Sequence, residues 1–511
     1  MQFKSGTLTL KDLRDFAARD VQVELDPTDR HRMGETRRIV EGRIAQGIAT
    51  YGVNTGFGTL SNHLIPARDL KELQRRLIVS NAAGTGELMR RADVRRMMLL
   101  KAGALASGRS GARPELADAI LALLNHDITP CVPSKGSVGA SGDLAPLAHM
   151  GAALIGIGDV IHGGHIVPAS KALQAAGLAP FTLAAKEGLS IVNGTQASTS
   201  FAVAGLFRAE ELFAAALAAG ALSVEAAHGQ DMAFDERLHA ARGQPGQIAV
   251  ARFLRKLLAG SGIRATARAT GRLQDPYCLR CQPQVMGAAY DQLRHAADVL
   301  AYEINAWTDN PMVDAESGDI LYGGNFHAEP VGMAADAIAV ALAEIGAMSE
   351  RRIAMLTDPN HSRLPAFLVK ETGLDSGFMV AQVTAAALAS ENKSLAHPAT
   401  VDSIPTTANH EDFVSMATFA GRRLADMADN VAAIIAIELL AACQGLEFRR
   451  PARSSDLLEK IHADIRRRTP AYEEDRFFAP DIAAAKEIVL SGAFLAMLPA
   501  DLTLSSASSP S

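Results

Sequence analysis

Residues 413–443 read FVSMATFAGRRLADMADNVAAIIAIELLAAC and carry the strongest fold signal in the chain. The stretch contains no proline, and Leu424, Met427 and Val431 recur at spacings of three and four residues. This spacing places the apolar side chains on one face of an α-helix. The length of the stretch suits the central rod of a helical bundle.

Further helices and a different N-terminal part complete the predicted organisation. Residues 377–396 read as a second rod, and the apolar spacing in residues 338–348 marks a buried helical stripe. The first third alternates short helical stretches with glycine-rich loops, and we expect the few strands there. We predict a mainly α chain, with a smaller mixed N-terminal domain (1–200) and a long-helix bundle domain (201–511). A C-terminal cap and a disordered serine-rich tail (505–511) end the bundle domain.

Composition and charge exclude several classes of partner. The 511 residues carry a formal net charge of -6, and the clusters of Lys and Arg are short, so no nucleic-acid partner is expected. The alanine-rich run 201–222 is long enough to cross a bilayer, but Arg208, Glu210 and Glu211 interrupt it. Charges at that depth are expensive in lipid. We therefore expect a buried helix and no membrane partner.

The chain contains four cysteines, too few for a disulfide framework at this length. Cys278 and Cys281 form a lone C-x-x-C motif without the second pair of a structural zinc site. His63 and His327 lack metal-ligand spacing as well, so we expect no metal. Buried free thiols and a cytoplasmic location are the simplest interpretation.

Residues 136–144 (GSVGASGDL) contain the tripeptide Ala140-Ser141-Gly142, which is able to close on itself. The amide nitrogen of Gly142 can reach the Ala140 carbonyl because glycine has no Cβ to crowd it. Loss of one water on closure, and of the Ser141 hydroxyl as a second, leaves an imidazolone ring with an electron-poor methylene. Asp143 could move protons during closure, or it could only cap the following helix.

Six separated blocks put this tripeptide in context. The blocks are YGVNTGFG (51–58), GSVGASGDLAP (136–146), NGTQ (193–196), QDPYCLRCQPQ (274–284), GGNFHAEP (323–330) and VDSIP (401–405), which leads to Glu411. With these blocks in this order, the chain resembles the aromatic amino acid ammonia-lyase family almost from end to end. The resemblance implies a fumarase/aspartase-like helical architecture and a homotetramer whose active sites draw on several subunits. It also implies the prosthetic group MIO (4-methylidene-imidazol-5-one), formed autocatalytically from Ala140-Ser141-Gly142, with no external cofactor.

The resemblance assigns roles to particular side chains. It makes Tyr51 the base that removes the β-proton, and Arg280 the two-pronged partner of the substrate carboxylate. Asn193 and Gln274 supply amide hydrogen bonds around the ring and the carboxylate. The remaining roles fall to a hydroxyl near the reacting groups, a ring beside the electrophile and a carboxylate facing the amine or the substrate ring: Tyr277, Phe326 and Glu411.

Two positions depart from the pattern of the family. Histidine-specific members usually carry Ser-His where this chain has Ser80-Asn81, and family members commonly carry Asn-Gln where it has Asn409-His410. Asparagine hydrogen-bonds but cannot exchange a proton as histidine does, so a polar substrate ring is still expected. We predict elimination of ammonia from L-histidine to give urocanate, with His410 as a second candidate substrate-binding residue.

Three other functions remain as alternatives. The substrate could be another polar aromatic amino acid, L-tyrosine or a modified histidine. The enzyme could be an aminomutase, which shares the electrophile and returns a β-amino acid. A non-catalytic scaffold would be expected to have lost Ser141, Tyr51 or Arg280, and this chain keeps all three.

Overall fold

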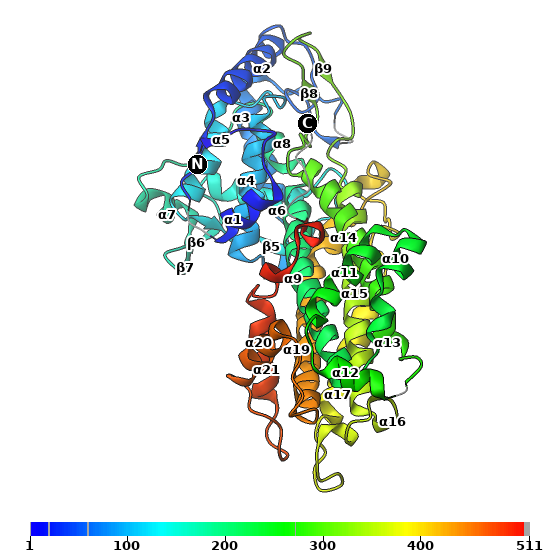
Figure 1. The fold of residues 1–511 in the computed structure, drawn as a ribbon. Helices are drawn as coiled ribbons and strands as arrows, with labels where there is room; N and C mark the ends of the chain where they lie inside the picture. The colour runs from blue at the N-terminus through cyan, green and yellow to red at the C-terminus, as the bar shows by residue number, and fades with distance from the viewer. Residues whose placement is uncertain (1, 19–20, 59–60, 271, 505–511) are drawn as a thin grey trace.

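The computed structural model describes residues 2–18, 21–58, 61–270 and 272–504 (Figure 1). The tail 505–511, for which disorder is predicted, lies outside the described residues. A smaller N-terminal part sits at one end of a long helical bundle. The bundle is built on long helices α9 (Gln196–Ala226), α14 (Gln282–Glu303), α15 (Glu329–Thr357), α17 (Met379–Leu395) and α19 (Leu424–Glu447). The predicted mainly α fold is confirmed.

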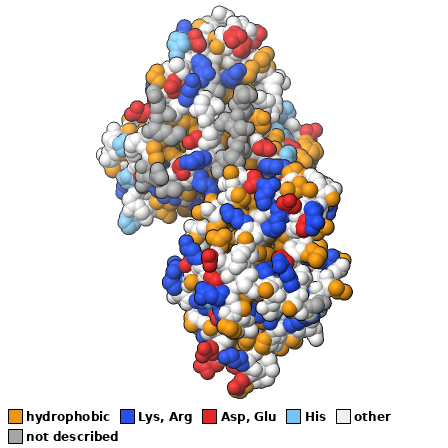
Figure 2. All heavy atoms as spheres, in the orientation of Figure 1, with side chains coloured by type: hydrophobic (Ala, Val, Ile, Leu, Met, Phe, Trp, Pro, Cys, Tyr) orange, Lys and Arg blue, Asp and Glu red, His pale blue; other side chains and the backbone are white. Residues whose placement is uncertain are grey.

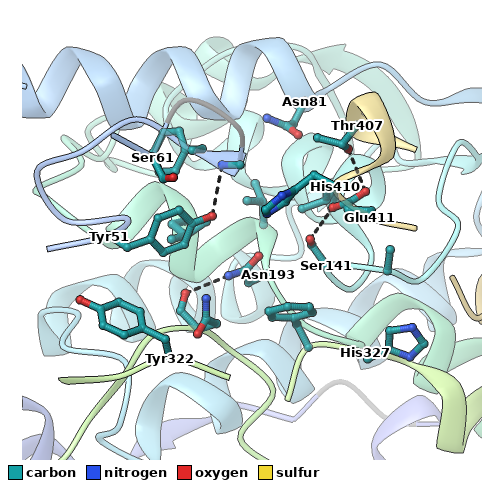
Figure 3. Close-up of a pocket in the computed structure, with 18 of the residues that line it drawn as sticks. Tyr51, Ser61, Asn81, Ser141, Asn193, Tyr322, His327, Thr407, His410 and Glu411 are labelled. Carbon is teal, nitrogen blue, oxygen red and sulfur yellow. Dashed lines mark hydrogen bonds between the residues drawn. The ribbon is translucent and has the colours of Figure 1, made fainter. Parts of the chain in front are cut away.

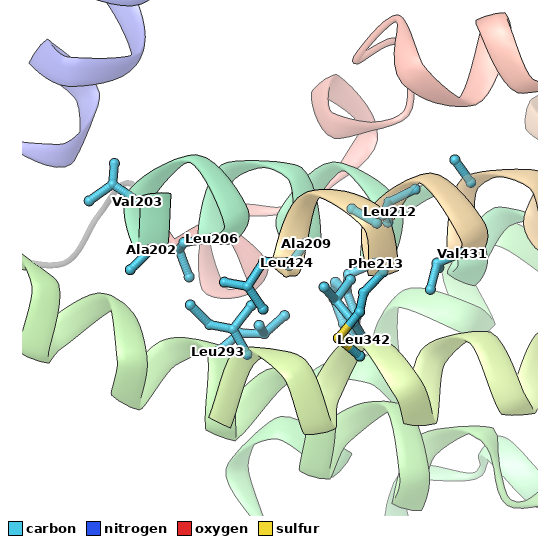
Figure 4. Packing of buried hydrophobic residues seen from close by; sticks show 14 of the residues in the cluster. Ala202, Val203, Leu206, Ala209, Leu212, Phe213, Leu293, Leu342, Leu424 and Val431 are labelled. Atoms are coloured by element: carbon cyan, nitrogen blue, oxygen red, sulfur yellow. The ribbon is translucent and has the colours of Figure 1, made fainter. Parts of the chain in front are cut away.

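The long helices pack closely because glycines and alanines line their contacts. A Cβ built on Gly205 of α9 would lie 2.4 Å from Leu424 Cδ1 of α19, and one on Gly220 would lie 2.0 Å from Gln282 Oε1. Larger residues at these positions would push the helices apart. Leu206 and Phe213 of α9 then meet apolar side chains of α14, α15 and α19 in one continuous core (Figure 4).

A buried ion pair crosses the middle of this core. Arg352 on α15 donates to both carboxylate oxygens of Glu438 on α19, at 2.5 and 2.8 Å, and neither side chain is exposed. Ser223 of α9 and Ser349 of α15 donate to the same carboxylate at 2.7 and 2.6 Å. Three helices are thus joined by one polar cluster surrounded by apolar side chains.

Helix α15 is long and apolar enough to cross a membrane, with a mean hydropathy of 1.7 over its most apolar window. That window is 61% buried inside the bundle, which marks a core helix. The run 201–222 lies within α9, and nearly all its side chains are buried as predicted. Side chains of both charge signs are interspersed over the face shown in Figure 2.

Short helices and 3-10 turns surround the bundle. The α-helices are α10 (Glu236–Arg242), α11 (Pro245–Leu258), α12 (Ile263–Ala269), α13 (Tyr277–Arg280), α16 (Pro359–Ser362), α18 (Ala417–Arg422), α20 (Asp456–Arg466) and α21 (Ala479–Leu490). Helix α13 lies on the flank of the bundle, well away from the N-terminal part (Figure 1).

The N-terminal part mixes helices with short strands, as predicted. Its helices are α1 (Leu10–Ala18), α2 (Pro27–Ala45), α3 (Leu70–Asn81), α4 (Arg91–Ala106), α5 (Pro114–Asn125), α6 (Leu144–Leu154), α7 (Ala169–Ala175) and α8 (Glu187–Val192). Its strands are β1 (Gln2–Phe3), β2 (Glu24–Leu25), β3 (Thr85–Leu88), β4 (Thr129–Pro130), β5 (Pro133–Lys135), β6 (Asp159–His162) and β7 (His165–Pro168).

These strands form small separate sheets. Strands β1 and β2 pair in parallel, β3 pairs with β5, and β4, β6 and β7 form an antiparallel sheet. A later hairpin, β8 (Met312–Val313) with β9 (Ile320–Leu321), returns to the N-terminal part beside α2. The predicted domain boundary near residue 200 falls in the first turns of α9.

The predicted rod 413–443 begins later and ends later than expected. Its helices start at Ala417 and continue to Glu447, with a break at Arg423 between α18 and α19. The first residues are not helical because their polar groups bind the loop before the tripeptide. Met416 N donates to Val138 O at 2.8 Å, and Ser415 Oγ donates to Gly139 O at 2.9 Å.

Candidate active site

A cavity of about 590 Å³ opens where the N-terminal part meets the end of the bundle (Figure 3). Several loops that are far apart in the sequence contribute to its wall. Eight of the predicted site residues line it: Tyr51, Asn81, Ala140, Ser141, Asn193, Phe326, His410 and Glu411. Four of the six quoted blocks (51–58, 136–146, 193–196 and 323–330), together with Glu411, therefore converge on one place.

The tripeptide lies in the loop between β5 and α6, pressed against the turn that precedes α9. Gly142 has a φ of +79°, and a Cβ there would lie 2.1 Å from the carbonyl oxygen of Gly194. Asp143 N donates to that same oxygen at 2.7 Å, and Gly194 N donates to Ser141 O at 3.4 Å. Glycine is thus required at position 142 by backbone conformation and by space.

Asp143 holds this loop in place through its buried side chain. Its fully buried carboxylate accepts hydrogen bonds from Ser137 Oγ, Thr418 Oγ1 and Ser198, the last through both its backbone N–H and its hydroxyl. The distances are 2.7 to 3.0 Å. The side chain makes no hydrogen bond to the start of α6, so the capping interpretation of Asp143 is wrong. Its donors come instead from α9, from α18 and from Ser137 in the same loop.

Glu411 lies next to Ser141 in the cavity wall. Ser141 Oγ donates to Glu411 Oε1 at 2.5 Å, while Thr406 and Thr407 donate to Oε2 at 2.7 and 2.9 Å (Figure 3). Burial raises the pKa of Glu411, but the three hydroxyl donors together outweigh it and bring the pKa below its ordinary value. The carboxylate is therefore ionised at neutral pH, where it can accept from an ammonium or an imidazole N–H.

Tyr51 stands at the opposite side of the cavity, on the glycine-rich loop. Gly52, with a φ of +72°, leaves room for Leu189, because a Cβ there would lie 2.2 Å from Leu189 Cδ2. The Tyr51 hydroxyl accepts a hydrogen bond from Gly58 N at 3.3 Å, and its ring meets Tyr322 edge to face at 6.4 Å. Residues 59–60 of this loop are not described.

Asn193 projects into the cavity from the end of α8. Its amide nitrogen donates to Asp309 Oδ1 at 3.2 Å and to the carbonyl of Asn310 at 3.0 Å. Both partners can only accept, so the orientation of the amide is fixed. The side-chain carbonyl oxygen of Asn193 is the atom left to face the cavity, as Figure 3 shows.

The positions expected to select the substrate, Ser80, Asn81 and His410, do not all lie in the cavity wall. Asn81 lines the cavity, and its amide nitrogen donates to Leu77 O at 2.7 Å, which leaves its oxygen as the acceptor available to a ligand. Ser80 is exposed, does not line the cavity, and donates to the same carbonyl at 3.2 Å. His410 points into the cavity beside Glu411 (Figure 3).

Gln274, Tyr277 and Arg280 do not line the cavity of their own chain. They lie in and just before α13, on the flank of the bundle, where Tyr277 is 71% exposed. The Arg280 guanidinium stacks over the Tyr277 ring at 4.6 Å, and its Nε donates to Asp275 O at 2.9 Å. One chain alone therefore assembles only part of the predicted set.

Some residues in or beside the cavity were not predicted as site residues from the sequence. Thr406 and Thr407, which hold Glu411, carry no motif and are found only through the fold. Tyr322 directly precedes the Gly323-Gly324 block, and that proximity was an available signal. His327 lines the cavity wall, where its Nε2 lies 3.1 Å from Phe413 O. Across the described residues, no cluster of three metal-binding side chains occurs.

Comparisons with known proteins identify the family of the chain. Residues 8–467 match the family model described as aromatic amino acid lyase. The chain is 56% identical to the histidine ammonia-lyase of Rhodospirillum rubrum over 500 residues, which is 98% of this chain and 97% of that protein.

Solved structures show the same fold. The histidine ammonia-lyase of Trypanosoma cruzi superposes with a TM-score of 0.91 at 36% identity, covering 99% of this chain and 97% of that one. The tyrosine aminomutase of Streptomyces globisporus gives a TM-score of 0.91 at 33% identity, covering 97% and 98%. The chain is a carbon–nitrogen lyase and belongs to the aromatic amino acid lyase family.

Proposed function

We propose that this enzyme eliminates ammonia from L-histidine to give urocanate. The observation that carries the proposal is the placement of Ala140 and Ser141 in the wall of a cavity, with the Ser141 hydroxyl held 2.5 Å from Glu411. The similarity to histidine ammonia-lyases over nearly the whole chain supports the substrate.

The residues around the tripeptide fit the MIO group. The backbone of Gly194 fills the space that a side chain at position 142 would need, so only glycine fits there, and glycine has no Cβ to crowd its own nitrogen. Asp143 directly follows the tripeptide, and the hydrogen bonds to its carboxylate fix its position, which favours a bent loop over an extended one. Once formed, the ring would supply an electrophilic carbon at the position of Ser141 Cβ.

The side chains in the cavity would then bind the substrate and move its protons. The side-chain oxygen of Asn193 and the Glu411 carboxylate, which keeps its Thr406 and Thr407 donors when the Ser141 hydroxyl is lost, are acceptors suited to the substrate amine and the imidazole N–H. Tyr51, across the cavity, would remove the β-proton over a short distance. The Phe326 ring would pack beside the reacting groups and exclude water from one side.

The substrate carboxylate needs a cation, and we propose that a neighbouring subunit provides it. In a homotetramer, Arg280, Tyr277 and Gln274 of one chain would complete the cavity of another. Gln274 and Tyr277 are exposed on the flank of the bundle and Arg280 is half-buried beside them, which supports this arrangement. We place the enzyme in the cytoplasm, where its four unpaired cysteines would remain reduced.

Because Asn81 and His410 depart from the family pattern, the main alternative concerns which aromatic amino acid is the substrate. L-Tyrosine or a modified histidine would also offer a polar group to these two side chains. An aminomutase outcome is the second alternative, favoured by the likeness to a tyrosine aminomutase. A lyase and an aminomutase would use the same binding site and would differ in the product that they release.

A panel assay separates these functions. Purified enzyme is incubated with L-histidine, L-tyrosine, L-phenylalanine and a modified histidine, and both ammonia and the ultraviolet absorbance of the acrylate product are followed. We expect equal amounts of ammonia and urocanate from L-histidine. A β-amino acid without ammonia would identify a mutase, and silence across the panel would contradict the proposal.

Replacing Asn81 with histidine should raise kcat/KM for L-histidine. A histidine at this position can both donate and accept, and one added hydrogen bond of about 1 kcal/mol corresponds to roughly fivefold. The matched control is Ser80→Ala, which alters the neighbouring side chain outside the cavity. A fall in kcat/KM for Asn81→His alone would show that Asn81 is matched to a different substrate.

A further inference from the structure

Lys101 is a buried cation that the proposed mechanism does not use. It lies on α4, is 1% exposed, and points toward the end of α8 behind the cavity. Its Nζ donates to the carbonyl of Ser190 at 3.1 Å and, over a shorter distance, to the carbonyl of Asn193. Both acceptors are backbone carbonyls rather than carboxylates. Burying a charge in such surroundings is costly, so its presence suggests a role.

The contact with Asn193 connects Lys101 to the tripeptide. The Asn193 carbonyl and the Gly194 N–H belong to the same peptide group. Lys101 donates to the carbonyl end of this peptide, and the N–H end donates to Ser141 O at 3.4 Å. Hydrogen bonds in a chain polarise one another, so a cation at one end strengthens the donor at the other. The Ser141 carbonyl is conjugated with the methylene in the proposed ring.

The neighbouring charges keep this arrangement in place. Lys186, also fully buried, donates to Asp309 Oδ2 at 2.7 Å and to Ser190 Oγ at 3.0 Å. Asp309 in turn fixes the Asn193 amide. Burial lowers the pKa of Lys101 to about 7, against opposing attraction from Asp309 and Asp143. Lys186 already pairs with Asp309, so Lys101 is the lysine whose amino group is directed at the peptide, and it carries a positive charge there when it is protonated.

We propose that Lys101 is a positioning residue that acts through the Asn193–Gly194 peptide to withdraw electron density from the Ser141 carbonyl. The competing interpretation is structural: Lys101 would only cap the carbonyls at the C-terminal end of α8. The two interpretations predict opposite changes in activity and stability when the charge is removed. The inference rests on the proposed function, because it concerns the same tripeptide.

The test compares Lys101→Met and Lys101→Gln with the wild type. Methionine keeps the length and removes the charge and the donor, whereas glutamine keeps a neutral donor. Formation of the proposed ring removes two water molecules, so the protein should be lighter than its sequence requires by that mass. For Lys101→Met we expect this two-water mass deficit to remain and KM for L-histidine to stay within about twofold. We expect kcat to fall about 10- to 100-fold, the range implied by loss of a charged hydrogen bond. Lys101→Gln should lie between Lys101→Met and the wild type.

Thermal unfolding provides a readout independent of activity. The folded pKa of about 7 lies below the 10.5 of an unperturbed lysine, so Lys101 costs most stability at pH 7 and below. That cost disappears as the pH rises to 10.5. The Tm of Lys101→Met should therefore equal or exceed that of the wild type, most clearly at pH 7. Lys186→Met, which leaves Asp309 unpaired, should instead lower Tm.

Several outcomes would overturn the inference. They are an unchanged kcat in Lys101→Met, a lowered Tm with full activity, or loss of the two-water deficit, which would move the role of Lys101 to ring formation. A wild-type enzyme without the deficit or without ammonia release would instead contradict the proposed function.

Discussion

Replacing Ser141 with alanine is expected to abolish ammonia release while the fold stays intact. The substitution removes the hydroxyl whose loss would create the electrophilic carbon, and no other described side chain in the cavity wall can supply one. We expect kcat to fall by a factor on the order of 10³ or more. The fold should persist because Ser141 lies in a loop and its main structural partner is Glu411.

The measurement is steady-state turnover of L-histidine beside circular dichroism and thermal unfolding. Ser107→Ala is the matched control, since Ser107 is the C-cap residue of α4, does not line the cavity, and donates its hydroxyl to Ala104 O at 2.7 Å. It should keep wild-type turnover. Appreciable residual turnover in Ser141→Ala would exclude this serine as the source of the electrophile.

Replacing Glu438 with alanine is expected to give the largest loss of stability. The change leaves the Arg352 guanidinium charged, fully buried and without its carboxylate, and it removes the acceptor for Ser223 and Ser349. Removing one partner of a buried ion pair costs about 3–5 kcal/mol. Unfolding in denaturant, at one fixed protein concentration, measures the loss.

The control replaces both partners with apolar residues of similar size, Arg352→Met together with Glu438→Leu. Such exchanges are often neutral or stabilising, because no buried charge is left alone. The double variant should therefore recover most of the lost stability. If Glu438→Ala unfolds at the wild-type denaturant midpoint, the ion pair does not stabilise the bundle.

The sequence predicted the bundle well because helical periodicity is a local property. The rod 377–396 corresponds to α17, and the run 201–222 lies within α9. The start of the rod 413–443 was predicted incorrectly. Residues 413–416 follow the same apolar pattern, but the Met416 N–H donates to Val138 O and the Ser415 hydroxyl donates to Gly139 O, and both acceptors are far away in the sequence. No local pattern reports such a contact.

The site was predictable where chemistry requires a particular residue. Gly142 is required by its φ and by the approach of Gly194, and a motif records that requirement. The groups that support the site were not predictable. Asp309, Lys101 and Lys186 act through side-chain contacts between separate elements, and buried lysines look like surface lysines in a sequence. The positions of Arg280 and Tyr277 could not be predicted from one chain either.

Mass analysis of the native enzyme tests the central claim most directly. A proteolytic fragment that spans Ala140-Ser141-Gly142 is measured alongside the intact protein. We predict that both are lighter than the sequence requires by two water molecules, with the whole deficit in that fragment. A fragment of full sequence mass would contradict the account, because the tripeptide would then be an ordinary loop.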